Sequence, residues 1–297
     1  MSEQFNLAFN LLDESFDSGE TGNYGLALLL SETSISFCTL DIRRNKFLGL
    51  HQIVRKAPNP GEKLSNTAPS FGEFLTSAGD TFPWMKYQFR MVKIGFEGEK
   101  STLVPAALYD PGENDRYLNF NFAQNRDDEI RSDHLLPLDA WQVYTLPHSA
   151  LVATAGLFPG SRVIHASSLL IESVWLNYKN RINAVHVFLH VRGQHFDLMI
   201  FDGRQMSYYN SFPFQSPEDV TYYLIFVLEQ LNYNPETIPL ILLGNIEAVE
   251  GLSELLLRYV RHVETGQRNE AYRYSYILNK LPHHAFFPLL NFFSCGL

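Results

Sequence analysis

The residues best suited to chemistry surround one turn in the second half of the chain. The run is His190-Val191-Arg192-Gly193-Gln194-His195-Phe196-Asp197. If Arg192-Gly193 is a two-residue turn, His190 lies opposite His195, and the alternation of strand side chains puts Asp197 and His186 on the same face. Imidazoles and a carboxylate are zinc ligands, and a guanidinium binds phosphate. The alternative, which we prefer, is a polar sheet face whose histidines hydrogen-bond neighbouring groups. The sequence thus assigns no metal site and no catalytic residue.

Two short combinations of histidine and serine suggest hydrolase chemistry, at His148-Ser149 and at 165–168, where the order is His-Ala-Ser-Ser. The sequence has no Gly-x-Ser-x-Gly elbow, the turn that exposes a nucleophilic serine. Serine is common at helix starts, so Ser149 and Ser167 are predicted to be helix-start residues. Cys38, in an expected strand, and Cys295 are predicted to be buried thiols rather than nucleophiles or disulfide partners.

The elements that position the turn follow from hydrophobic spacing. β-Branched and aromatic residues predict strands over 183–191, 194–202 and 205–211. Ser216 before Pro217 marks a helix start, because serine caps a helix and proline fits its first position. The rest of this half is expected to contain a strand at 239–243, a helix over 252–263, a strand near 271–277 and a helix near 283–293.

The first half repeats this order. Ser70 and Glu73 have the spacing of a capping box. The expected elements are strands at 25–31, 33–41 and 46–54, a polar loop at 57–69, a helix at 70–80 and a strand at 88–96. Between the two copies we expect a helix at 104–109, a strand at 116–122, an exposed loop at 124–137, a strand at 141–146, a helix at 148–158, a strand at 162–166 and a helix at 167–180.

The repeated order predicts an α/β protein with mixed sheets and two similar lobes. The expected division is an acidic N-terminal segment at 1–22, a first lobe at 23–181 and a second lobe at 182–297. In the N-terminal segment, Phe and Leu residues are interspersed with acids. This segment is either a docking segment for a partner or an element that covers the first lobe.

The charge of the chain argues against some functions. The formal net charge is -9, and residues 1–42 contain seven acids and no lysine or arginine. Nucleic acid needs a basic surface, so it is not expected as a partner. A ribonuclease-H-type nuclease is disfavoured because 25–31 and 183–191 lack the carboxylates that would hold its metal ions. Membrane insertion is not expected, because no apolar run has the length of a membrane helix. The first residues lack a secretory pattern, so we expect a cytoplasmic protein.

A repeated three-strand meander followed by alternating helices and strands resembles the actin, sugar-kinase and heat-shock-chaperone superfamily. More narrowly, the chain resembles an uncharacterised bacterial family of unknown function with an actin-like ATPase fold, over nearly all residues beyond 22. The stretches that carry this resemblance are 103–108 (LVPAAL), 196–203 (FDLMIFDG), 208–212 (YYNSF) and 242–246 (LLGNI). The resemblance implies two ribonuclease-H-like βββαβα lobes in an actin-like arrangement.

ATPases of this superfamily hold phosphates on two turns, one in each lobe, each built around Asp-x-Gly. The first turn here, 29–34 (LLSETS), has no glycine and carries Glu32. The second turn is similar to the chaperone pattern DLGGGTFD, but only Gly193 and Phe196-Asp197 match it, and His190 stands where an Asp organises the metal. The Gly-Gly pair of the adenosine site is reduced to Gly244-Asn245.

The resemblance therefore implies a degenerate nucleotide site. The candidate ligand- or nucleotide-binding residues are His190, Arg192, Gly193, Gln194, His195, Asp197, Gly244 and Asn245. We expect a non-catalytic scaffold or binding protein with an unidentified protein partner and no cofactor. The alternative is a divergent ATP-binding enzyme or nucleotide-dependent switch, since Arg192 could meet a phosphate. A metal-dependent hydrolase at the His190 hairpin is a weaker alternative.

Overall fold

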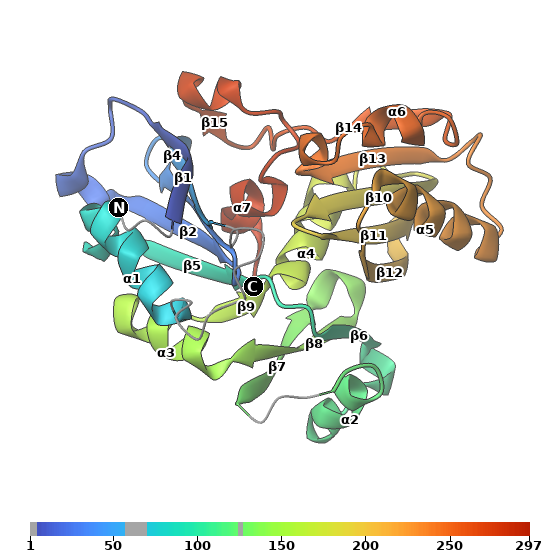
Figure 1. The fold of residues 1–297 in the computed structure, drawn as a ribbon, viewed down its shortest axis with the longest axis horizontal. Coiled ribbons are helices and arrows are strands. Elements are labelled where there is room, and N and C mark those ends of the chain that lie inside the picture. Colours follow the sequence, from blue (N-terminus) through green and yellow to red (C-terminus); the bar gives the residue numbers. More distant parts are fainter. Residues whose placement is uncertain (1–4, 57–69, 124–126) are drawn as a thin grey trace. The chain divides into compact units, whose positions relative to one another are not determined.

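A computed structural model of the protein describes residues 5–56, 70–123 and 127–297, and Figure 1 shows its elements. The loop expected at 57–69 lies outside these residues. The chain divides into two compact units. The first comprises Met1–Leu169, Glu270–Lys280 and Phe292–Leu297, and the second comprises Leu170–Asn269 and Leu281–Asn291. The lobe limits expected at 22 and 181 stay a prediction.

The first unit is built on a mixed seven-stranded sheet. Its strands are β1 (Phe5–Leu12), β2 (Tyr24–Leu30), β3 (Ser34–Asp41), β4 (Lys46–Arg55), β5 (Met91–Phe96), β9 (Val163–His165) and β15 (Arg273–Tyr274). Six strands follow the order β1-β4-β3-β2-β5-β9, and β15 pairs with β4. As predicted, β2, β3 and β4 form an antiparallel meander, and β5 then pairs with β2 in parallel.

The acidic N-terminal segment forms part of this sheet, because β1 pairs with β4 in antiparallel fashion. Of the two alternatives open from the sequence, the segment is an element of the first unit. Asp13, which follows β1, is buried and bonded by Lys46 at 2.8 Å. The paired cation explains how an acid is accommodated there, since a buried charge is costly without a partner.

Two helices of the first unit pack together, α1 (Phe71–Thr81) and α3 (His148–Leu157). The predicted capping box is confirmed: the Glu73 amide donates to the Ser70 hydroxyl at 3.2 Å, and the Ser70 amide donates to the Glu73 carboxylate at 2.6 Å. Phe74 and Leu75 of α1 join the buried cluster beneath the sheet. Apolar burial of this kind stabilises the layer by roughly 25 cal/mol per Å².

A small three-stranded sheet, in the order β6-β8-β7, is inserted between β5 and α3. Its elements are β6 (Ser101–Pro105), α2 (Asn114–Asn119), β7 (Asp128–Leu135) and β8 (Ala140–Pro147). Only β8 was predicted correctly. The expected helix at 104–109 begins as a strand, the expected strand at 116–122 is largely the helix α2, and most of the expected loop at 124–137 is β7.

Tertiary pairing explains these three errors. β7 carries the polar sequence DEIRSDHL, which no strand pattern predicts, yet β8 pairs with it along its whole length. α2 contributes Leu118 to a buried cluster with Val104 and Val143 of the inserted sheet. The pairing of β7 with β8 and the packing of α2 against the inserted sheet therefore decide the conformation of these two segments.

The second unit repeats the sheet of the first. Its strands are β10 (Val185–Arg192), β11 (His195–Asp202), β12 (Gln205–Pro213), β13 (Pro239–Gly244) and β14 (His262–Thr265). They follow the order β12-β11-β10-β13-β14, which corresponds to β4-β3-β2-β5-β9 in the first unit. In both sheets an antiparallel meander continues into parallel strands. This shared order is the predicted duplication.

Three further helices are α5 (Pro217–Gln230), α6 (Leu252–Leu256) and α7 (Phe287–Asn291), and α4 (Ala166–Tyr178) spans the boundary between the units. The helix expected over 252–263 ends early, because residues from His262 onward pair with β13 as the strand β14. The expected strand near 271–277 is limited to β15. The expected C-terminal helix is limited to α7, preceded by Phe286 at a φ of 53°.

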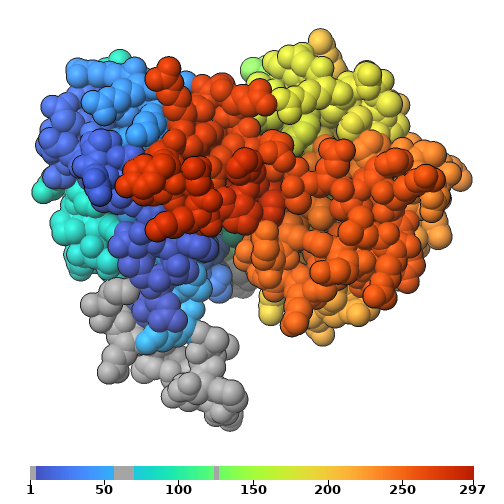
Figure 2. Space-filling view, turned by 90° about the horizontal axis from the view of Figure 1, so that it is seen from above, coloured from blue at the N-terminus to red at the C-terminus, as the bar shows by residue number. Residues whose placement is uncertain are grey.

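Residues Glu270–Lys280 return to the first unit, and Figure 2 shows this orange-red part of the chain beside the blue N-terminal part. Arg273 and Tyr274 pair with Lys46 and Phe47 of β4. Both cysteines are buried, and neither forms a disulfide in the described part of the chain, as predicted. In the part of the chain that the structure describes, no helix combines the length and the apolarity needed to span a bilayer.

Candidate functional site

The predicted site lies at the end of the β10–β11 hairpin in the second unit. The turn residues are Gly193 and Gln194, not Arg192 and Gly193, so Arg192 pairs with His195 and His190 pairs with Asp197. Gly193 has a φ of 49°, which glycine adopts without strain. The predicted pairing of His190 with His195 is therefore wrong. Since the partner shifts by two residues, the prediction that these side chains share one face still holds.

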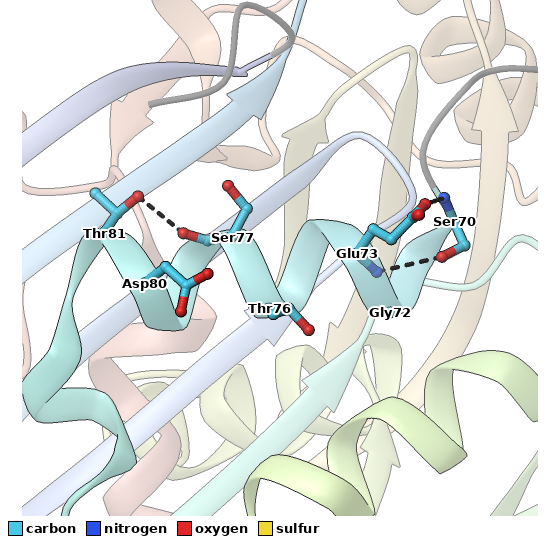
Figure 3. Close-up of a pocket in the computed structure, with 7 residues that line it drawn as sticks. All are labelled: Ser70, Gly72, Glu73, Thr76, Ser77, Asp80 and Thr81. Atoms are coloured by element: carbon cyan, nitrogen blue, oxygen red, sulfur yellow. Dashed lines mark hydrogen bonds between the residues drawn. The ribbon is translucent and has the colours of Figure 1, made fainter.

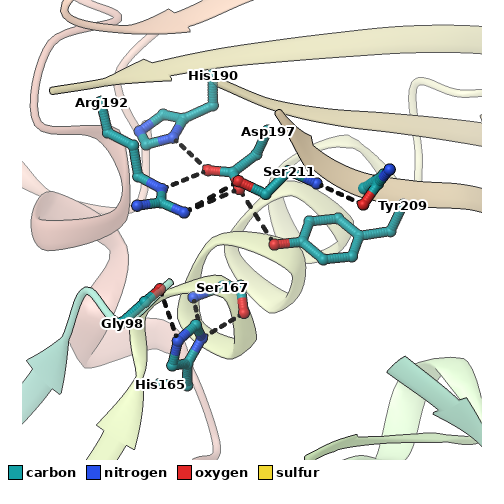
Figure 4. Close-up of polar contacts among 9 residues, drawn as sticks. Gly98, His165, Ser167, His190, Arg192, Asp197, Tyr209 and Ser211 are labelled. Carbon is teal, nitrogen blue, oxygen red and sulfur yellow. Dashed lines mark hydrogen bonds and ion pairs between the residues drawn. The ribbon is translucent and has the colours of Figure 1, made fainter. Parts of the chain in front are cut away.

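Asp197 is the centre of a hydrogen-bonded network in this hairpin, drawn in Figure 4. Its Oδ2 accepts from Arg192 Nε at 2.9 Å and from His190 Nδ1 at 3.3 Å. Its Oδ1 accepts from the hydroxyl of Tyr209 at 3.1 Å. Arg192 Nη2 also donates to the Ser211 hydroxyl at 3.1 Å. Both oxygens of the carboxylate are thus occupied by groups of the protein.

The electrostatics of this network keep Asp197 ionised. Its side chain is 1% exposed and that of Arg192 is 14% exposed. Burial by itself raises the pKa of the Asp197 carboxyl, but the charge of Arg192 and the hydrogen bond from His190 outweigh burial and hold this pKa well below its usual range. The arrangement is a neutralised internal ion pair.

Gly244, the glycine expected to approach an adenine, packs against the same hairpin. A Cβ atom built on it would lie 2.2 Å from the Val191 carbonyl oxygen and 2.8 Å from Cδ2 of His190. Its amide donates to the His284 carbonyl at 2.9 Å, and its own carbonyl accepts from His284 Nδ1 at 3.0 Å. The Asn245 amide donates to the Val191 carbonyl at 2.9 Å. Close packing within the second unit therefore accounts for the glycine.

The first predicted phosphate turn, between β2 and β3, uses its own amides internally. Ser31 N donates to the Ser34 carbonyl at 2.8 Å, and the Ser31 hydroxyl accepts from the amides of Ser34 and Thr33 at 2.9 and 3.3 Å. Glu32 at its tip is exposed. A phosphate-binding turn needs amides aimed at the anion, whereas three amides of this turn bond within it.

The histidines of the β10–β11 hairpin do not form a metal centre. Nδ1 of His186 lies 3.0 Å from the Ala184 carbonyl, and His190 is committed to Asp197. Over residues 5–56, 70–123 and 127–297, no group of three or more His, Cys, Asp or Glu side chains is arranged to hold a metal ion.

Comparison with known proteins shows the family of the chain. A family model described as "Protein of unknown function (DUF3822)" matches residues 13–263. The chain belongs to this family. No curated protein matches the DUF3822 chain.

Solved structures give the fold of this DUF3822 protein. It is similar to a Bacteroides thetaiotaomicron protein with an actin-like ATPase fold and unknown function, with a TM-score of 0.75, 20% identity and coverage of 95% of this chain and 99% of that chain. It is also similar to a chain of a PilM-PilN type IV pilus biogenesis complex, with a TM-score of 0.59, 12% identity and coverage of 90% and 96%. The protein therefore has the actin-like ATPase fold that the sequence resemblance implied.

Sequence reasoning missed Tyr209, Ser211 and His284 as members of the site. Tyr209 and Ser211 are two residues apart on β12, and Ser211 pairs directly with Asp197. A register for the β11–β12 hairpin would have found both, because cross-strand partners share a face. His284 is contributed by a distant segment of the second unit, and no local signal marks it.

The serines suspected of hydrolase chemistry lie at helix starts, as predicted: Ser149 is in the first turn of α3, and Ser167 is in the first turn of α4. His165 Nδ1 accepts from the Ser167 amide at 3.2 Å and lies 2.5 Å from its hydroxyl, while Nε2 lies 3.2 Å from the Gly98 carbonyl (Figure 4). The imidazole thus caps the helix, because it satisfies an amide that has no partner within the helix.

A hollow outside the hairpin lies along the polar face of α1, shown in Figure 3. All its described lining residues belong to α1 or its cap: Ser70, Gly72, Glu73, Thr76, Ser77, Asp80 and Thr81. Two of these side chains, those of Ser70 and Glu73, each accept from the other residue's backbone amide in the capping box. The described lining of this hollow comes from one helix and its cap, whereas the Asp197 network joins β10, β11 and β12, so the β10–β11 hairpin remains the candidate functional site.

Proposed function

We propose that this protein is a non-catalytic, actin-like binding or scaffold protein whose nucleotide site is degenerate. The observation that carries the proposal is the state of Asp197. This acid, retained in the second phosphate turn, is neutralised by Arg192 and bonded by His190 and Tyr209. A catalytic carboxylate that organises magnesium and water needs accessible oxygen atoms, and a phosphate would have to displace Arg192 from an existing ion pair.

The first turn and Gly244 support the same proposal. Amides of the first turn bond within it, and Gly244 is required by close packing against His190 and Val191. Each of the three places that serve nucleotide in the superfamily thus has an internal structural use here. The similar PilM-PilN structure is a complex between two proteins, which supports a protein partner for the present chain.

The test is a thermal-unfolding and hydrolysis experiment on the full chain with millimolar ATP or ADP and magnesium. A ligand present at 100 times its dissociation constant adds about 2.7 kcal/mol to the free energy of unfolding, so binding would raise the melting temperature measurably. We expect no rise in melting temperature and no phosphate release above background.

Two outcomes would replace the proposal. Phosphate release that an Asp197→Asn variant abolishes would make the protein an ATPase. A rise in melting temperature without phosphate release, lost on Arg192→Gln substitution, would favour the nucleotide-dependent switch.

A further inference from the structure

Helix α5 carries exposed aromatic side chains in addition to the apolar residues that it buries in the core. Val220, Leu224 and Val227 are buried in the second unit. On a different side of the helix, Tyr222 and Phe226 are 64% and 46% exposed. Residues four apart lie one above the other on a helix, and the two rings stack with centroids 6.1 Å apart. The outer side of α5 therefore presents a small aromatic wall.

This wall forms one side of a groove of about 370 Å³ between α5 and the region of α6. Leu255 of α6 and the following Tyr259, which is 52% exposed, form the other side. The two helices, both labelled in Figure 1, pack on each other. Exposed apolar patches rimmed by polar residues mark interaction sites.

Acidic side chains stand along the α5 side of the groove. Glu218 and Glu229 both line it and are both exposed. They are three helical turns apart, about 16 Å along the axis at 1.5 Å per residue. No lysine or arginine is among the described residues that line the groove. The groove therefore favours a positively charged ligand. The aromatic rings strengthen this preference, because aromatic faces attract cations.

We propose that this groove binds a basic amphipathic helix of a partner protein. Aliphatic side chains of that helix contact Tyr222, Phe226 and Tyr259, and lysines or arginines about three turns apart pair with Glu218 and Glu229. A helix fits because an apolar face laid between two helices buries anchors spaced three and four residues apart. The inference rests on the proposed function of a binding protein, and it adds the surface and the chemistry of the partner.

The test is a selection of random 16-residue peptides, displayed on phage, against the immobilised full chain. The enriched peptides are expected to carry Lys or Arg on both sides of aliphatic residues at helical spacing. Synthetic copies should bind a Tyr222→Ser/Phe226→Ser variant at least tenfold more weakly. They should bind a Glu218→Gln/Glu229→Gln variant severalfold more weakly, with less dependence on salt. Glu250→Gln, an exposed acid outside the groove, is the matched control and should change nothing.

Three results would overturn the proposal: enriched peptides without basic residues, enriched peptides that bind the variants as tightly as the original chain, or concentration-dependent self-association that the Phe226→Ser change removes. The last would make a second copy of this chain the occupant. Circular dichroism checks that the serine variants fold. The Glu218→Gln/Glu229→Gln variant tests the proposal with the aromatic wall intact. ATP hydrolysis would refute the proposed function without altering these peptide affinities, so the two failures are distinguishable.

Discussion

Asp197 illustrates how a buried acid can be held by side chains of its own sheet. Its carboxylate lies among Arg192, His190 and Tyr209, so its charge is used within the second unit. Breaking a buried ion pair on one side leaves an uncompensated charge, which is more costly than losing the pair altogether. The pair therefore makes the hairpin sensitive to single substitutions.

We predict that Asp197→Asn lowers the free energy of unfolding by about 3–5 kcal/mol, because Arg192 then lacks its buried counter-charge. The pH dependence should change as well. The folded pKa of Asp197 lies below its unfolded value, so its contribution is complete above about pH 4 and is lost as the pH falls further. The variant should lose less stability than the original chain below about pH 4, as measured by urea unfolding at several pH values.

The matched control for this prediction is Asp202→Asn. Asp202 ends the same strand, but its side chain is exposed, so its replacement should change the free energy of unfolding by less than about 0.5 kcal/mol. Equal effects of the two substitutions would contradict a special role for the Asp197 network.

At the scale of elements, capping side chains that can be recognised in the sequence define where α5 starts. The Ser216 hydroxyl accepts from the Asp219 amide at 3.3 Å, and the Asp219 carboxylate accepts from the Ser216 amide at 3.2 Å. Pro217 follows at the first helical position. This reciprocal cap sets the start of α5, and the burial of Val220 and Leu224 decides which side of the helix faces outward.

Replacing Ser216 by alanine should lower the free energy of unfolding of the second unit by about 1 kcal/mol, because one helix amide loses its acceptor. The measurement is a denaturant melt followed by circular dichroism. Ser216→Thr keeps the hydroxyl and should restore most of the loss. If threonine were as damaging as alanine, the cap would not be the source of the effect.

At the scale of the whole molecule, the first unit is completed by residues from the end of the sequence. Phe292 is 1% exposed, and Lys93 donates to the carbonyls of Phe292 and Cys295 at 3.1 and 2.6 Å. A Cβ built on Gly25 would lie 2.5 Å from the ring of Phe293, so glycine is required there for the ring to approach β2. Residues near the end of the chain thus pack against β2 and β5 of the first unit.

We predict that a chain ending at Asn291 loses at least about 3 kcal/mol of stability in the first unit, since removal of one buried phenylalanine side chain alone costs about 3–5 kcal/mol. Amide hydrogen exchange should accelerate in β2 and β5. Removal of Leu297 alone is the control and should leave that exchange slow. Unchanged protection of β2 after loss of residues 292–297 would show that the first unit folds without them.

The amino-acid sequence by itself determined the repeated strand order, the two capped helices and the fold family, because each depends on local spacing or on short motifs. It also identified the hairpin that holds His190, Arg192 and Asp197. Only the tertiary structure decided the register of that hairpin, the conformation of the insertion around β7, and the use of Gly244. Hydrogen-bonded pairing and close packing between distant segments override weak local preferences. For the same reason, the partners of Asp197 became visible only once β10, β11 and β12 were paired.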